Sequence, residues 1–292
     1  MNRFAFFALV LAGVSWGLGF PLGKLVLRET DAAHMVLLRF ATAAIVAAPF
    51  ALMTAEARAL FCSPVVLLAG ALYGIAFMVQ FEGLAHVSVT LAALLVGAMP
   101  ALIAISARFF GEKVSRASWA GVIAATLGAA LIAGKPDGAG STLGVALSLA
   151  SLLVFLAWLI VLRRAPKVEA TMAIPAVTVI VAAATILPIA FLMHGPPKLD
   201  LSPVAWASIV GQGVVATLLA TAAWQYGSAR VGAASAGVFI NIEPLIGAAI
   251  GVMLFGDHLT LALCAGGLLI VAGSFAVVMG EGKAAEAAQE PT

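Results

Sequence analysis

Apolar residues run along this chain in long stretches, separated by short segments that hold most of its charge. An α-helix needs about 20 apolar residues to cross the hydrocarbon core of a bilayer. Dividing the chain at its polar residues, prolines and glycines predicts ten such helices, at residues 4–25, 33–54, 63–82, 87–108, 117–134, 143–163, 172–193, 203–226, 232–255 and 259–280. The first stretch lacks a clear cleavage site, so we interpret it as a retained helix. The pattern predicts an all-α integral membrane protein with ten transmembrane helices.

Composition supports this prediction. The chain is 63% hydrophobic and 10% charged, with a mean hydropathy of +1.15, whereas a soluble domain is about 25% charged. A net charge of +2 is too small to indicate nucleic-acid binding. We therefore expect a lipid bilayer and a small-molecule substrate as partners and no nucleic acid, with the oligomeric state left open and a monomer among the options.

Positive residues are retained on the cytoplasmic side of a membrane, so their distribution predicts orientation. Ten lie on the side that both termini share: Arg3, Arg58, Arg108, Lys113, Arg116, Arg163, Arg164, Lys167, Arg230 and Lys283. Four lie on the other side, namely Lys24, Arg28, Lys135 and Lys198, and Arg39 falls inside the second span. This bias predicts a multi-pass protein of a bacterial inner membrane with both termini in the cytoplasm.

The chain also repeats itself. Residues 83–134 align with residues 227–274, so that Pro100 matches Pro244, Gly121 matches Gly266 and Gly128 matches Gly273. A repeat of five helices must enter the membrane from the opposite face in its second copy, which is the inverted architecture of many carriers. We expect one five-helix repeat over residues 1–135, a second over 140–280 and a disordered cytoplasmic tail over 281–292.

Several motifs resemble those of the EamA family of the drug/metabolite transporter superfamily. They are Gly97-Ala-Met-Pro100 with Phe110-Gly-Glu-Lys113, Ile242-Glu-Pro-Leu245 with Phe255-Gly-Asp-His258, Ser15-Trp-Gly17 and Leu38-Arg-Phe40. The likeness covers about residues 4–280. It implies two five-helix halves and export of amino acids or other metabolites, with the YddG-type aromatic amino acid exporters as the most similar subgroup.

Two charged residues fall inside predicted spans, where charge is costly and marks function or pairing. Glu243, near the middle of the ninth span, is either a substrate-binding or proton-carrying carboxylate, or a structural group paired with Arg39 or a helix terminus. Arg39 lies about a turn and a half from the outer end of the second span. Its side chain either extends outward to the interface or binds a substrate carboxylate in a bidentate manner.

Uncharged candidates lie at comparable depth. Tyr73, Phe77 and Gln80 share one face of the third helix because they are spaced i, i+4 and i+7. The full set of predicted substrate-binding residues is Trp16, Tyr73, Phe77, Gln80, Trp158, Gln212, Asn241 and Glu243. Pro21, Pro100 and Pro244 are predicted hinges, because proline removes an intrahelical hydrogen bond.

No clustered acid/base groups or metal-ligand spacings occur in the sequence, so we expect no enzyme activity, no metal and no cofactor. We predict alternating-access export of small organic metabolites, with aromatic or other apolar amino acids favoured. The alternatives are a membrane-embedded enzyme acting on lipid-linked substrates, and a carrier for a different metabolite or drug class.

Overall fold

The computed structural model describes residues 3–111, 114–134, 140–169, 172–231 and 238–287. Within these ranges the chain forms helices and no strand, apart from an isolated bridge between Val87 and Gly140. The elements are α1 (Arg3–Gly17), α2 (Gly19–Val26), α3 (Ala32–Leu52), α4 (Ala55–Ala59), η1 (Leu60–Cys62), α5 (Pro64–Ala85), α6 (Val89–Val96), α7 (Met99–Phe109), α8 (Arg116–Gly134), α9 (Thr142–Leu162), α10 (Ala173–His194), α11 (Pro203–Val210), η2 (Gly211–Leu219), α12 (Ala220–Val231), η3 (Val238–Asn241), α14 (Ile242–Phe255) and α15 (Leu261–Ala287).

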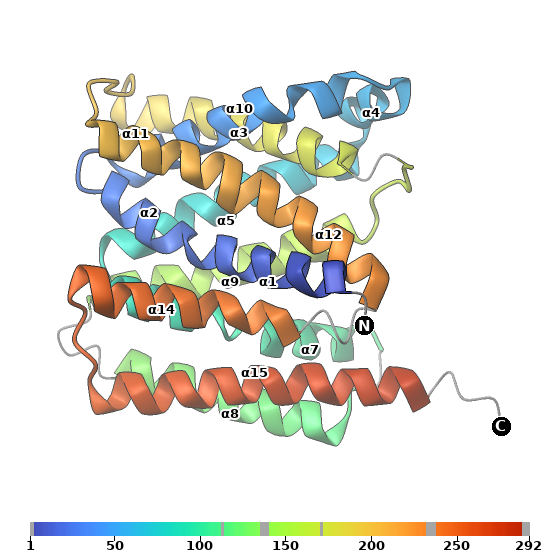
Figure 1. Cartoon of the computed structure of the whole chain (residues 1–292), viewed down its shortest axis with the longest axis vertical. Helices are drawn as coiled ribbons and strands as arrows, with labels where there is room; N and C mark the ends of the chain where they lie inside the picture. Colours follow the sequence, from blue (N-terminus) through green and yellow to red (C-terminus); the bar gives the residue numbers. More distant parts are fainter. Residues whose placement is uncertain (1–2, 112–113, 135–139, 170–171, 232–237, 288–292) are drawn as a thin grey trace.

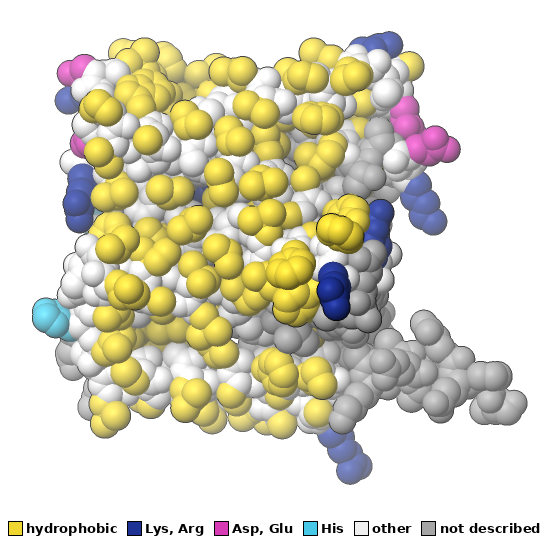
Figure 2. Space-filling model, in the orientation of Figure 1, with side chains coloured by type: hydrophobic (Ala, Val, Ile, Leu, Met, Phe, Trp, Pro, Cys, Tyr) yellow, Lys and Arg dark blue, Asp and Glu magenta, His cyan; other side chains and the backbone are white. Residues whose placement is uncertain are grey.

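The long helices lie side by side along a common direction (Figure 1). Hydrophobic side chains cover the surface between the helix ends, whereas charged side chains gather mainly at the two ends (Figure 2). Large apolar residues such as Leu192 and Phe109 are 87% and 85% exposed. An apolar belt between two charged ends matches the bilayer, so the protein is a multi-pass membrane protein.

Among the described residues, eight helices are long and apolar enough to cross a membrane. They are Arg3–Val26, Ala32–Leu52, Pro64–Ala85, Val89–Phe109, Thr142–Leu162, Ala173–His194, Pro203–Arg230 and Leu261–Gly280. Two shorter apolar helices, Arg116–Ile132 and Phe239–Phe255, lie where the sequence predicts the fifth and ninth spans. Every predicted stretch therefore coincides with an apolar helix, while the number of full crossings stays a prediction.

Three of these helices are interrupted shortly before a proline. The first breaks at Leu18, three residues before Pro21, and α6 ends three residues before α7 begins, with Pro100 in the first turn of α7. The third is the junction of η3 with α14, whose first turn contains Pro244. Proline has no N–H for the carbonyl four residues earlier, which explains why the helical ladder fails at these places. Whether the breaks act as hinges stays a prediction.

Helices α8 and α15 pack backbone to backbone through four glycines. A Cβ atom added to Gly121 would collide with the carbonyl oxygen of Gly273, and one added to Gly128 would lie 2.5 Å from that of Gly266. Since the earlier glycine of one helix faces the later glycine of the other, the two helices run antiparallel. Small residues permit this close approach. Its van der Waals contacts hold the two helices together in lipid, where no hydrophobic effect drives helices to associate.

The last helix runs further than the sequence predicts. We expected disorder from residue 281, but the backbone of residues 281–287 continues α15, and residues 288–292 lie outside the described part. Ala284, Ala285 and Ala287 have the highest intrinsic helix propensity. The preceding helix supplies the costly nucleus, so the segment extends it.

Candidate functional site

Arg39 is buried within the helix bundle and is only 2% exposed. Its Nε donates a hydrogen bond to Thr217 Oγ1 at 3.1 Å, and its Nη1 donates to Gln212 Oε1 at 3.3 Å. The guanidinium carbon lies 4.2 Å from the ring centre of Phe77 and 5.4 Å from that of Phe81. The interpretation that this side chain extends to the interface is therefore wrong. Neutral acceptors and aromatic faces replace water around the cation.

Both acceptors belong to an unusual segment, the nine-residue π-helix η2. The Thr217 hydroxyl donates to the carbonyl of Gln212 at 2.9 Å, which spans the five residues of a π-helical turn. Gly213 brings η2 against α3, since a Cβ there would lie 2.7 Å from the Arg39 carbonyl oxygen. Such π-helical turns are frequent at functional sites. Sequence reasoning missed Thr217, and only the two glycines flanking Gln212 hinted at an irregular helix.

Aromatic rings surround this cation on one side. Tyr73 and Phe77 have ring centres 4.9 Å apart, which agrees with the predicted common face of this helix. Trp158 lies 4.8 Å from Tyr73, and Phe155 lies 5.0 Å from Phe77. Phe40, 5.5 Å from both Tyr73 and Phe77, completes the cluster. The sequence analysis missed Phe155 and Phe40, although Phe155 precedes Trp158 by three residues on one helical face.

Other predicted residues lie elsewhere or at the margin of this cluster. Trp16 contacts Trp224, with ring centres 5.4 Å apart, so it belongs to the α1–α12 pair of helices. Gln80 is buried on α5, one turn beyond Phe77, and Asn241 is buried at the end of η3.

Glu243 lies in the first turn of α14. The sequence placed this residue near the middle of a continuous helix, but the helix starts afresh at Ile242. A helix N-terminus carries a partial positive charge, which stabilises a carboxylate there. The structure records no direct ion pair between Glu243 and Arg39, whose hydrogen bonds go to Thr217 and Gln212.

Two buried donors lack an acceptor: Gln212 Nε2, on the side chain that Arg39 contacts, and the indole Nε1 of Trp158, which packs on Tyr73 in the aromatic cluster. A guanidinium only donates, so the oxygen of Gln212 must face Arg39 and its amide nitrogen must point elsewhere. Each buried unsatisfied group costs about 1–3 kcal/mol. A cation beside the spare amide donor of Gln212 favours a ligand that offers several acceptor atoms, such as a carboxylate.

One end of the molecule is tied together across its two halves. Glu29 accepts hydrogen bonds from the backbone N–H and hydroxyl of Ser202, which lower the pKa of its carboxyl. His34 contacts the Asp31 carboxylate at 2.7 Å and the Gly195 carbonyl oxygen at 3.0 Å. Burial works to raise the pKa of Asp31, but the hydrogen bonds and positive charge of His34 outweigh burial and lower it. These contacts join the α2–α3 loop to the α10–α11 segment.

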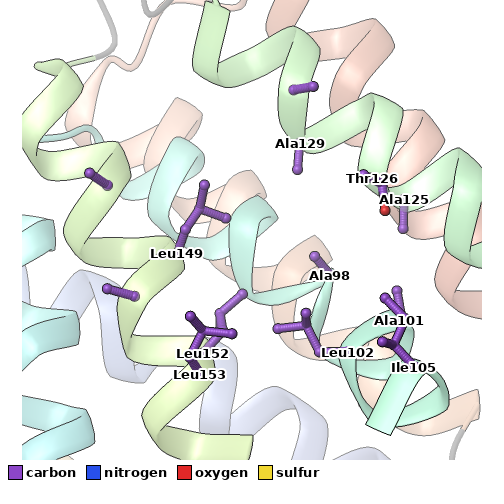
Figure 3. A pocket seen from close by; sticks show the side chains of 13 residues that line it. Ala98, Ala101, Leu102, Ile105, Ala125, Thr126, Ala129, Leu149, Leu152 and Leu153 are labelled. Carbon is purple, nitrogen blue, oxygen red and sulfur yellow. The ribbon is translucent and has the colours of Figure 1, made fainter. Parts of the chain in front are cut away.

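A separate apolar groove of about 530 Å³ lies between α7, α8 and α9 (Figure 3). Its lining consists of Ala98, Ala101, Leu102, Ile105, Ala125, Thr126, Ala129, Ala130, Ala146, Leu149, Ala150, Leu152 and Leu153. None of the predicted substrate-binding residues is among them. The groove and the Arg39 cluster are therefore different features.

Comparison with known proteins identifies a family. The model of the EamA-like transporter family matches residues 3–134 and 142–279. No curated protein matches the chain. One solved crystal structure superimposes with a TM-score of 0.65 over 98% of this chain and 99% of its own, at 18% sequence identity. At this identity the likeness concerns the fold alone.

Proposed function

This chain belongs to the EamA-like transporter family, and from that premise we propose that it exports small organic metabolites across a bacterial inner membrane by alternating access. Amino acids with aromatic or other apolar side chains are the favoured substrates. The single observation that carries this proposal is the buried guanidinium of Arg39 beside an aromatic cluster, with the spare amide donor of Gln212 next to it. One end of this site suits a carboxylate and the other an apolar body.

The glycine contacts support two inverted repeats of five helices each. Gly121 and Gly128 of the first repeat align with Gly266 and Gly273 of the second. Exchanging the repeats therefore turns the Gly121–Gly273 contact into the Gly266–Gly128 contact. Corresponding helices that pack antiparallel through corresponding residues are what a two-fold axis in the membrane plane produces.

The family match also supports this division. Its two matched segments, residues 3–134 and 142–279, nearly coincide with the repeats proposed for residues 1–135 and 140–280. We further propose that both termini lie in the cytoplasm, on the strength of the positive-charge bias. Lys113 and Lys135, which enter that bias, lie outside the described residues.

For the substrate site we propose that Arg39 and the free amide N–H of Gln212 hold the carboxylate. The apolar body would lie against Tyr73, Phe77 and Trp158. These rings contact one another at about 5 Å in this conformation. They must separate to admit a substrate, as expected of a carrier that alternates between states. The breaks before Pro21, Pro100 and Pro244 are the proposed hinges.

Reconstitution into liposomes tests the function directly. We expect saturable uptake of one or more members of a panel of amino acids and metabolites, measured with radiolabelled substrates. Ion current would indicate a channel, and consumption of a lipid-linked substrate an enzyme; either result would contradict the proposal. An Arg39→Lys variant should insert normally but bind substrate more weakly, because lysine offers no planar fork to a carboxylate.

Glu243 decides whether transport is coupled to protons. Its carboxylate is the candidate proton carrier, and its place at a helix N-terminus is the alternative structural explanation. A Glu243→Gln variant should then lose uphill transport under a proton gradient while retaining downhill flux. Full uphill transport in this variant would exclude the residue as the proton carrier.

A further inference from the structure

We propose that the apolar groove between α7, α8 and α9 binds one acyl chain of a bilayer phospholipid. This inference requires only that the protein lies in a membrane, so it stands independently of the substrate. The groove occupies about 530 Å³ (Figure 3). Its one polar side chain, Thr126, donates its hydroxyl to the Val122 carbonyl at 2.8 Å and so has no hydrogen left to donate to a polar ligand. The groove therefore selects an apolar occupant.

The groove lies at the depth of the hydrocarbon core. Leu102 and Leu152, which line it, are near the middle of the spans Val89–Phe109 and Thr142–Leu162. It is also continuous with the lipid-facing surface, since Leu153 in its lining is 58% exposed. At this depth the surrounding medium is lipid tails rather than water. The molecules available to the groove at this depth are therefore hydrocarbon chains of lipids.

The internal repeat explains why the groove exists. In the alignment that matches Gly121 with Gly266, the groove residue Ala130 corresponds to Phe275. On α9 the correspondence follows from contacts. Gly83 packs on Gly144 as its counterpart Gly227 packs on Ala5, and Ala150 therefore corresponds to Leu11.

At these two positions the groove thus has alanines where the equivalent helices have large side chains. The equivalent helices α1 and α14 also pack more closely than residue size allows for α9 and α7. On the equivalent side, Gly17 of α1 lies so close to Ile246 of α14 that an added Cβ would come within 2.7 Å of its Cβ. The counterparts of this pair, Leu156 and Leu102, are both large, so α9 and α7 lack the small residue that lets α1 and α14 approach closely. A gap between transmembrane helices forfeits dispersion contacts unless something fills it, and an acyl chain restores them.

The test uses the full chain reconstituted in phosphatidylcholine liposomes doped with a phosphatidylcholine that carries a diazirine in one acyl chain. After irradiation, labelled peptides are mapped by mass spectrometry. We expect adducts concentrated on the groove faces of α7, α8 and α9. The double substitution Ala130→Phe with Ala150→Leu, which installs the residues of the equivalent positions Phe275 and Leu11, should remove most of them. An Ala272→Phe variant, altered on the lipid-facing side of α15, is the matched control and should retain them.

Equal labelling of all lipid-facing helices would overturn the proposal, as would unchanged labelling in the filled variant. If a metabolite rather than lipid occupies the groove, labelling will fall as that metabolite is added, and this result would also refute the inference. Ala130→Phe alone serves where the double variant inserts poorly, because residue 130 is exposed and tolerates a larger ring. It should reduce the groove adducts in the same direction.

Discussion

Replacing Thr217 with valine tests whether η2 holds Arg39 in place. The Thr217 hydroxyl accepts a hydrogen bond from Arg39 Nε at 3.1 Å and donates one to the Gln212 carbonyl at 2.9 Å. Valine has nearly the same shape but neither capacity. The substitution therefore removes two buried hydrogen bonds, one of them from a charged group, without opening a cavity.

The expected magnitude follows from what is left unpaired. A buried donor or acceptor without a partner costs about 1–3 kcal/mol, and more when the group is charged. Because Arg39 keeps its bond to Gln212 and its contact with Phe77, we expect a loss of roughly 2 kcal/mol in unfolding free energy. If Arg39 binds the substrate carboxylate, misplacing it should also weaken substrate binding, by about tenfold for each 1.4 kcal/mol of lost interaction.

The measurements are thermal unfolding in detergent and the KM of liposome uptake. Thr221→Val is the matched control, because the Thr221 hydroxyl donates only to the Thr217 carbonyl one turn earlier on the same span. We expect the control to change stability by less than about 0.5 kcal/mol and to leave KM unaltered. Equal effects of the two substitutions would refute the view that Thr217 positions Arg39.

Three further predictions concern packing, hinges and pH. Gly121→Ala should destabilise the protein by about 1–3 kcal/mol, because its Cβ would meet the Gly273 carbonyl in the rigid α8–α15 contact; unchanged thermal unfolding would contradict the backbone packing described. Pro244→Ala should slow transport while the protein still inserts, and transport at the normal rate would remove Pro244 from the hinges. The pKa of Asp31 is lowered in the folded state, so its contribution to stability is present above the unfolded pKa of about 3.9 and is lost as pH falls through the folded pKa. Asp31→Asn should therefore reduce the fall in thermal unfolding temperature between about pH 5 and pH 3. A fall as steep as in the unchanged protein would show that the His34 contacts of Asp31 are not its cause.

The chain's apolar pattern was enough to predict its helices, because spanning a bilayer imposes a length and a polarity that are visible in one dimension. Helix periodicity likewise placed Tyr73 and Phe77 on one face, as the structure confirms. The glycines of α8 and α15 were identifiable as a repeat, and their use in packing follows from their size. These features are local or repetitive, so they need no knowledge of the tertiary structure.

The partners of Arg39 could not be predicted from the sequence. Its partners Thr217 and Gln212 lie about 175 positions away in the chain, and the π-helix that presents them has no periodic signature in an apolar segment. The sequence predicted Glu243 near the middle of a helix, whereas the structure has it in the first turn of α14. A local break in the chain, which composition does not reveal, decides where this helix begins. Sequence alone determined which groups enter the membrane, since insertion depends on polarity. Tertiary structure decided which groups meet there, because desolvated charges take whatever partners the packing of distant helices supplies.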